Sequence, residues 1–198
     1  MASSLRIGQC LRGRNGIYAI GKQLQDSLAR KIIEPSDSPA IVLKYLGNNI
    51  LNASLFKRLT GQGIRYVARR ILEALKVLHD NNFVHTDVKP DNILVKYGLG
   101  DVRFTDVQLA DCGNTLPADS AYAKDGDLIG APTWRSPEGQ LRIGWGTQTD
   151  IYISSEKKKT FSRISQQEIS KEDKEFILKI MKLDPRDRPS AAELLQDE

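Results

Sequence analysis

Cysteine is scarce in this sequence, which contains only Cys10 and Cys112 among 198 residues. Two isolated cysteines cannot build the disulfide framework of a small secreted domain, so we expect a reducing compartment. No run of apolar residues approaches the length of a membrane span, and the first residues lack the apolar core of a secretory signal. We therefore expect no membrane partner.

Internal repeats, low-complexity tracts and basic patches interleaved with aromatic residues are also absent. The lack of such a patch argues against direct nucleic-acid binding. The net charge of +4 is a weak hint of acidic partners, and dispersed surface lysines explain it equally well. Hydrophobic residues at 40% and charged residues at 27% are typical of a globular protein. The length allows one or two small domains.

The first half of the chain alternates short apolar runs with turn residues and contains one long amphipathic segment. Residues 5–24 predict two strands around a glycine turn, and residues 40–43 predict a short buried strand. Between Gln62 and Asn81, apolar residues recur at helical spacing, which predicts a helix with one apolar face.

After this helix the pattern becomes strand-like and then polar. Residues 93–95 and 102–104 predict a hairpin, and residues 107–110 predict a further strand. Residues 113–133 show no periodicity and predict a long loop, which in a compact domain is usually functional or disordered.

Two more helices are predicted near the C-terminus. Ser170 and Ser190 are each followed three residues later by an acidic residue, which is the pattern of a capping box. Asp184 and Pro185 are expected to end the first of these helices, because proline cannot continue a helix. The outline is a small β-rich part followed by a mainly helical part.

Three short motifs in this outline point to a chemistry. Residues 85–92 read His-Thr-Asp-Val-Lys-Pro-Asp-Asn, residues 111–113 read Asp-Cys-Gly, and residues 136–138 read Ser-Pro-Glu. In this order they resemble the H-R-D-x-x-x-x-N catalytic loop, the D-F-G motif and the A-P-E motif of eukaryotic protein kinases. The resemblance implies an α+β, protein kinase-like fold.

The resemblance also implies roles for four residues. Asp87 would accept or orient the proton of the attacking hydroxyl, and Lys89 would reach the transferring phosphate. Asn92 and Asp111 would hold Mg²⁺, a hard cation that prefers oxygen ligands. ATP and Mg²⁺ are therefore the expected cofactors, and a Ser/Thr hydroxyl of a protein substrate is the expected acceptor.

Two details resemble SR-protein kinases and related fungal kinase-like proteins: Thr86 in the place of the H-R-D arginine, and the sequence of residues 110–115. This finer resemblance implies a location in the cytoplasm, the nucleus or both, with arginine-serine-rich proteins among the candidate substrates. A monomer is expected. Because Thr86 replaces an arginine that pairs with a phosphorylated loop in many kinases, we expect no switching by loop phosphorylation. Cys112, in the place of the D-F-G phenylalanine, is expected to be a buried structural thiol.

Other positions match supporting parts of the kinase pattern. Glu138 and Arg188 resemble a buried ion pair that fixes the register of the C-terminal part. Asp150 matches an aspartate that hydrogen-bonds the backbone of the catalytic loop. Residues 130–135 match the substrate-docking strip, in which Ala131 replaces the usual threonine.

The remaining candidate contacts of the nucleotide lie near the N-terminus. Gly13 and Gly16 form either a degraded phosphate-binding loop or a plain hairpin turn. Lys31 is the candidate for the lysine that the family carries on its third strand. Lys44 and Leu46 are candidate nucleotide contacts at the hinge.

The family pattern breaks in two places. Between Lys31 and Ile41 the chain is too short for the helix and the strand that the family has there. Polar residues follow Asp150, where the family has a long hydrophobic helix. We therefore expect a truncated N-lobe and hinge at residues 1–46, and a C-lobe at residues 47–198 that lacks part of its central helices.

The sequence leaves three functions open. The first is a protein Ser/Thr kinase, and the second is a pseudokinase or scaffold module without turnover, or an incomplete gene model. The third is a small-molecule phosphotransferase of the aminoglycoside-kinase type, which shares the pattern D-x-x-x-x-N. The sequence Lys89-Pro90 and the expected pairing of Glu138 with Arg188 argue against the third.

Overall fold

The chain divides into two compact units, residues 1–45 and residues 46–198, and each is described by itself. The computed structural model describes residues 10–13, 16–19, 45–100, 102–152 and 169–197. Lys31, Lys44 and the predicted strand at residues 40–43 lie outside the described residues.

The first unit contains a hairpin formed by β1 (Cys10–Gly13) and β2 (Gly16–Ala19). The strands are antiparallel, and Gly13 lies opposite Gly16 at the turn. This matches the prediction of two strands around a glycine turn.

A three-stranded antiparallel sheet forms one side of the second unit. Its strands are β3 (Asn48–Asn49), β5 (Ile93–Tyr97) and β6 (Phe104–Leu109), in the order β3-β5-β6. The predicted hairpin is confirmed, but the two strands expected at residues 102–104 and 107–110 are a single strand. The ladder between β5 and β6 runs from Phe104 to Leu109 with a register shift between Lys96 and Tyr97. The polar residues between the two apolar runs therefore do not end the strand.

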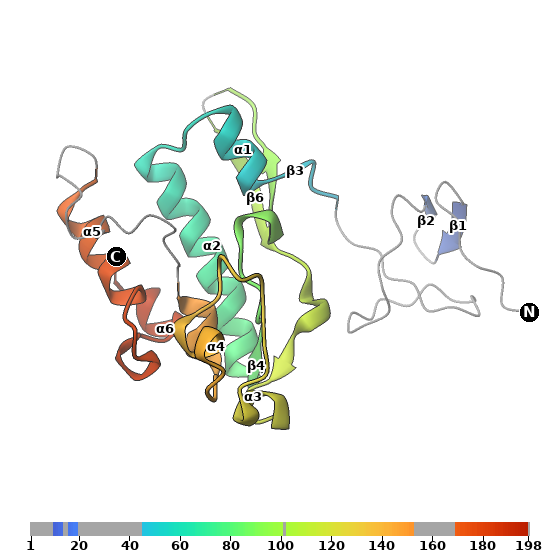
Figure 1. Cartoon of the computed structure of the whole chain (residues 1–198). Helices are drawn as coiled ribbons and strands as arrows, with labels where there is room; N and C mark the ends of the chain where they lie inside the picture. The colour runs from blue at the N-terminus through green and yellow to red at the C-terminus, as the bar shows by residue number, and fades with distance from the viewer. Residues whose placement is uncertain (1–9, 14–15, 20–44, 101, 153–168, 198) are drawn as a thin grey trace, which may run out of the picture. The chain divides into compact units, whose positions relative to one another are not determined.

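The longest helix of the second unit is α2 (Gly61–Asp80), which follows the short helix α1 (Ile50–Phe56). Thr60 caps α2 by accepting a hydrogen bond from the backbone N–H of Gly63 at 3.1 Å, which satisfies one of the free donors at a helix start. The helix predicted between Gln62 and Asn81 is therefore confirmed. Figure 1 shows α2 with α6 on one side and β6 on the other, and both elements contact it.

The segment predicted as a loop at residues 113–133 contains regular structure, so that prediction was wrong. A 3₁₀ turn, η2 (Cys112–Asn114), leads into β7 (Leu116–Pro117), which pairs with β4 (Phe83–Val84), and α3 (Ala121–Asp125) follows. Elements this short carry too few residues to show a periodicity. Ser120, which accepts a hydrogen bond from Ala123 N at 3.2 Å, and Gly126 at φ +70° were the available signals of helix start and end.

The C-terminal part consists of short helices. They are α4 (Pro137–Leu141), η3 (Thr147–Ile151), α5 (Lys171–Ile180), η5 (Pro185–Asp187) and α6 (Ala191–Leu194). Ser170 and Ser190 cap α5 and α6 as predicted, and Ser190 forms the full reciprocal capping box with Glu193. The segment that would decide whether a central helix follows Asp150 begins at residue 153 and lies outside the described residues.

The main hydrophobic core of the second unit lies between α2, the β5–β6 ladder and the C-terminal helices. Its members include Val67, Ile71 and Leu75 from α2, Val95 and Val107 from the sheet, and Leu194 from α6. These elements form a mixed helix and strand arrangement, as the α+β, kinase-like prediction requires. No helix in the described part of the chain is both long and apolar enough to cross a bilayer.

Candidate active site

The loop of residues 85–92 connects β4 to β5, and a buried carboxylate fixes its first turn. Asp150, on η3, accepts hydrogen bonds from His85 N at 2.7 Å and from Thr86 N at 2.9 Å. The ring of His79 donates to the same carboxylate at 3.1 Å. This confirms the predicted role of Asp150, and it explains how Thr86, a β-branched residue, is held at φ +71°.

Asp87 is the most constrained side chain of this loop. One carboxylate oxygen, Oδ2, accepts from Lys89 Nζ at 2.6 Å and from Asn92 Nδ2 at 3.1 Å, and Oδ1 accepts from the backbone N–H of Ala131 at 3.1 Å. Burial raises the pKa of this carboxyl, but the hydrogen bonds and the charge of Lys89 outweigh it, so the pKa lies below its ordinary value. Asp87 is therefore an anion at neutral pH.

The segment around Asp111 is tied to the same loop on both sides. The His85 ring donates from Nε2 to Ala110 O at 3.0 Å, and the Thr86 hydroxyl donates to Asn114 O at 2.9 Å. Ala110 N donates to Asn92 O at 2.8 Å. Because these bonds bracket Asp111, the structure brings the segments carrying Asp87, Lys89, Asn92 and Asp111 together.

The donor set of this region suits Mg²⁺ in part. The amide nitrogen of Asn92 is occupied by the backbone and side chain of Asp87, so its oxygen is the atom left for a cation. Asp111 is exposed and adds a carboxylate. Among the described residues no group of three His, Cys, Asp or Glu side chains could hold a metal. Asn92 and Asp111 therefore fit an ion that takes its other ligands from phosphate and water, as Mg²⁺ does in kinases.

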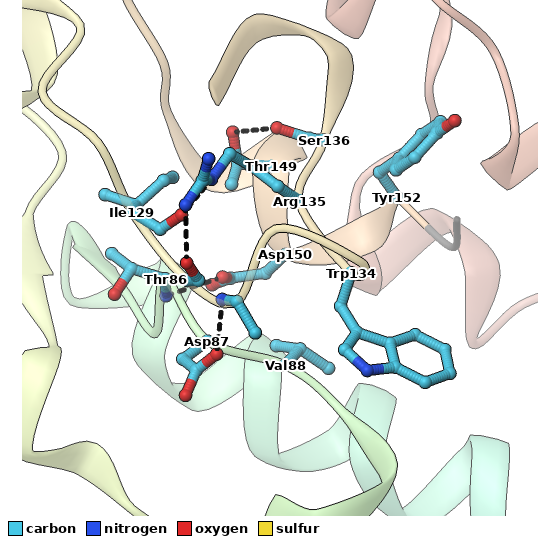
Figure 2. A pocket seen from close by; sticks show the side chains of 12 residues that line it. Thr86, Asp87, Val88, Ile129, Trp134, Arg135, Ser136, Thr149, Asp150 and Tyr152 are labelled. Atoms are coloured by element: carbon cyan, nitrogen blue, oxygen red, sulfur yellow. Dashed lines mark hydrogen bonds between the residues drawn. The ribbon is translucent and has the colours of Figure 1, made fainter. Parts of the chain in front are cut away.

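A small cavity lies behind the catalytic loop (Figure 2). It has a volume of about 10 Å³, and its lining includes Thr86, Asp87, Ile129, Arg135 and Asp150. A space of this size holds about one water molecule. This cavity is too small for a nucleotide.

Glu138 and Arg188 form a completely buried ion pair, as predicted. Two charged hydrogen bonds of 2.7 Å join them, and both side chains are 0% exposed. Burial raises the pKa of the Glu138 carboxyl, but the bonds from Arg188 and from the Thr149 hydroxyl hold it below its ordinary value. Arg188 also donates to three backbone carbonyls, those of Gln148, Lys182 and Leu183.

Of the other predicted site residues, the structure describes Leu46, Gly13 and Gly16. Leu46 is buried in the second unit, two residues before the start of β3. Gly13 and Gly16 face each other in the first unit, an arrangement that fits both a phosphate-binding loop and a plain hairpin turn. Lys31 and Lys44 lie outside the described residues, so their roles stay predictions. The expectation of a buried thiol at Cys112 was wrong, because this residue is exposed.

Two contacts of the site were not foreseen from the sequence. Ala131 stands where the family has a threonine, and its backbone N–H is the group that reaches Asp87. His79 supports Asp150 from the last turn of α2. Every residue except proline has a backbone N–H, so the sequence does not show which one binds Asp87. A single histidine at a helix end likewise does not show which residue it contacts.

Comparison with known proteins supports the kinase resemblance. A family model described as the protein kinase domain matches residues 27–155. Serine/threonine-protein kinase PAK 1 of Mus musculus is 34% identical over 113 residues, which is 57% of this chain and 20% of the relative. Serine/threonine-protein kinase shk1/pak1 of Schizosaccharomyces pombe is 27% identical over 182 residues, which is 79% of this chain and 27% of the relative.

A third relative, serine/threonine-protein kinase PAK mbt of Drosophila melanogaster, is 31% identical over 118 residues, covering 59% of this chain and 18% of the relative. The matched region thus spans between 18% and 27% of the length of these three curated relatives. All three names indicate Ser/Thr kinases of the PAK type.

Proposed function

This chain belongs to the protein kinase domain family, and we propose that it transfers the γ-phosphate of ATP to Ser/Thr hydroxyls of protein substrates. The observation that carries the proposal is the set of hydrogen bonds that fix the Asp87 carboxylate. This carboxylate is ionised and held by Lys89, Asn92 and the Ala131 amide. A carboxylate fixed in this way can orient a hydroxyl and take its proton during transfer.

Each residue of the loop has a defined task in this proposal. Asp87 orients the substrate hydroxyl, and Lys89, 2.6 Å from that carboxylate, is close enough to interact with the phosphate group that arrives there. Asn92 and Asp111 would hold Mg²⁺, whose positive charge would offset the negative charge of the phosphates. His85 and Thr86 keep the segment of Asp111 beside the loop.

Finer features of the proposal rest on the resemblance to SR-protein kinases. Arginine-serine-rich proteins are the proposed substrate class, and a monomer in the cytoplasm, the nucleus or both is the proposed state. Thr86 supports the expectation that activity does not require phosphorylation of the loop. Its hydroxyl already donates a hydrogen bond to the Asn114 carbonyl at 2.9 Å. Phosphatase treatment should leave the activity unchanged, and loss of activity would contradict this feature.

Nucleotide binding is tested first, by thermal unfolding of the full chain with and without Mg²⁺ and ATP. A ligand that binds only the folded state stabilises it by RT ln(1 + [L]/Kd), about 2.7 kcal/mol at a hundredfold excess over Kd. We expect the wild type to be stabilised and Asp111→Ala to lose most of this effect. Absence of any shift at millimolar ATP would contradict nucleotide binding.

Transfer is tested second, with labelled ATP and an arginine-serine peptide beside a Ser/Thr peptide without arginine. Asp87→Asn is the matched control, because the amide keeps the shape of the carboxylate and removes its charge. Label on the peptides with the wild type and none with Asp87→Asn supports the proposal. A preference for the arginine-serine peptide supports the finer substrate class, and equal labelling argues against it.

A pseudokinase is the second candidate function. It is favoured by two features of the sequence. The stretch between Lys31 and Ile41 is too short for the family's helix and strand, and the residues after Asp150 are polar where the family has a hydrophobic helix. Stabilisation by Mg²⁺ and ATP without label transfer would support this alternative.

A further inference from the structure

Arg135 holds two consecutive backbone carbonyls of the segment that passes the catalytic loop. Its Nε donates to Ile129 O at 2.6 Å, and its Nη2 donates to Gly130 O at 2.9 Å. The planar guanidinium carries its donors in a fixed fork, so the two bonds set the orientation of both peptide groups. Figure 2 shows the Arg135 side chain beside Ile129, next to the loop that carries Thr86 and Asp87.

The segment held by Arg135 comes closest to the catalytic loop at Gly130. Gly130 has φ +60°, and a Cβ added there would stand 2.6 Å from the carbonyl oxygen of Thr86. The next residue, Ala131, directs its backbone N–H to Asp87 Oδ1 at 3.1 Å. The Gly130 carbonyl and the Ala131 N–H belong to one planar peptide group, so Arg135 orients the group that carries the donor to Asp87.

The Ala131 amide serves the second oxygen of the Asp87 carboxylate, Oδ1. Lys89 and Asn92 both donate to the other oxygen of Asp87, and within the described residues Ala131 N is the donor that Oδ1 receives. A methyl side chain cannot donate, so the backbone N–H is all that position 131 can offer. If the amide turned away, the carboxylate would keep bonds on one oxygen only.

We propose that Arg135 is a positioning residue that aims the Ala131 N–H at Asp87 and thereby fixes the carboxylate plane for phosphoryl transfer. The inference rests on the proposed kinase function, but its first step is a statement about geometry alone. Arg135 acts through Ile129 and Gly130 and need not touch a substrate. Its loss should slow the transfer step and spare ATP binding, because Asn92 and Asp111 lie outside the bonds that it makes.

The test compares Arg135→Met, Arg135→Lys and Gln140→Ala in the full chain. Methionine keeps an apolar stem without donors, and lysine keeps the charge without the fork. Gln140→Ala is the matched control, because it removes only the 3.3 Å contact of Arg135 with the Gln140 side chain. Hydrogen exchange of the Ala131 amide, followed by NMR, reports the geometry, and amides of α2 such as Leu75 report global stability.

Both Arg135 variants should speed exchange at Ala131 by about tenfold or more while Leu75 exchange stays within about twofold. We expect kcat to fall by roughly a hundredfold with KM for ATP unchanged, as for a misplaced catalytic group. Gln140→Ala should match the wild type in both readouts. Unchanged exchange at Ala131 in Arg135→Met, or full rescue by lysine, would overturn the proposal.

The two proposals fail separately. If the wild type transfers no phosphate, the proposed function fails, and the exchange rate of Ala131 still decides whether Arg135 orients this amide. If Arg135→Met is unfolded, exchange at Leu75 reveals it, and Arg135→Lys supplies the decisive comparison. If transfer is normal in a folded Arg135→Met, the positioning role is refuted while the kinase function stands.

Discussion

Replacing either partner of the Glu138–Arg188 pair should destabilise the chain strongly and unequally. Removing one partner of a buried ion pair typically costs about 3–5 kcal/mol, because it leaves the other charge uncompensated. Glu138→Gln keeps one oxygen that can accept from Arg188, whose guanidinium also binds three backbone carbonyls. We therefore expect a loss of about 3 kcal/mol, at the lower end of this range.

Arg188→Met should be the worse change. It leaves the Glu138 carboxylate, at 0% side-chain exposure, with the Thr149 hydroxyl as its remaining side-chain donor in the described structure. It also removes the donor to the carbonyls of Gln148, Lys182 and Leu183. The expected loss is about 5 kcal/mol, which is comparable to the whole stability of many domains.

The assay is urea unfolding of the wild type and both variants, repeated from neutral to acid pH. Because the pKa of Glu138 is lower in the folded chain than its ordinary value of 4.5, its contribution is complete above that value. The contribution is lost as the pH falls through the folded pKa. The difference in unfolding free energy between Glu138→Gln and the wild type should therefore become smaller at acid pH. A loss below about 1 kcal/mol for Glu138→Gln, or a milder effect for Arg188→Met, would refute this reasoning.

Two further predictions concern helix ends. Ser190→Ala removes the cap of α6 and should lower the free energy of unfolding in urea by about 1 kcal/mol. Ser190→Asp should retain most of the stability, because aspartate can also cap a helix. Equal stability of Ser190→Ala and wild type would contradict the capping role. Gly126→Ala should cost more than about 1 kcal/mol, because φ is +70° and the new Cβ would meet Arg142 O at 2.5 Å. Gly61→Ala, where no atom lies within 4 Å, is its control, and equal effects of the two changes would contradict the steric argument.

Long periodic elements and capped helix starts were predictable from the sequence. The helix α2 was found because its apolar residues repeat over 20 residues. Ile64 belongs to that repeat but is 52% exposed, because helical spacing identifies a face and not the neighbours that cover it. The short helix α3 was missed, since five residues cannot show a period.

The candidate site was predictable only for contacts made by side chains whose residue type belongs to the family motif. The family motif identified Asp150 and the Glu138–Arg188 pair, and the structure shows their bonds. The contact from Ala131 to Asp87 comes from a backbone N–H, which every residue except proline possesses. Its position depends on Gly130 and Arg135, and the sequence alone gives no reason to connect them.

The central claim is that Asp87 serves phosphoryl transfer, and single-turnover label transfer from Mg²⁺-bound ATP to a Ser/Thr peptide tests it most directly. The wild type should transfer label to the peptide. Asp87→Asn should transfer none, although Mg²⁺ and ATP still raise its unfolding temperature. If the wild type and Asp87→Asn bind Mg²⁺ and ATP equally and neither transfers label above background, the claim is contradicted and the chain is a pseudokinase.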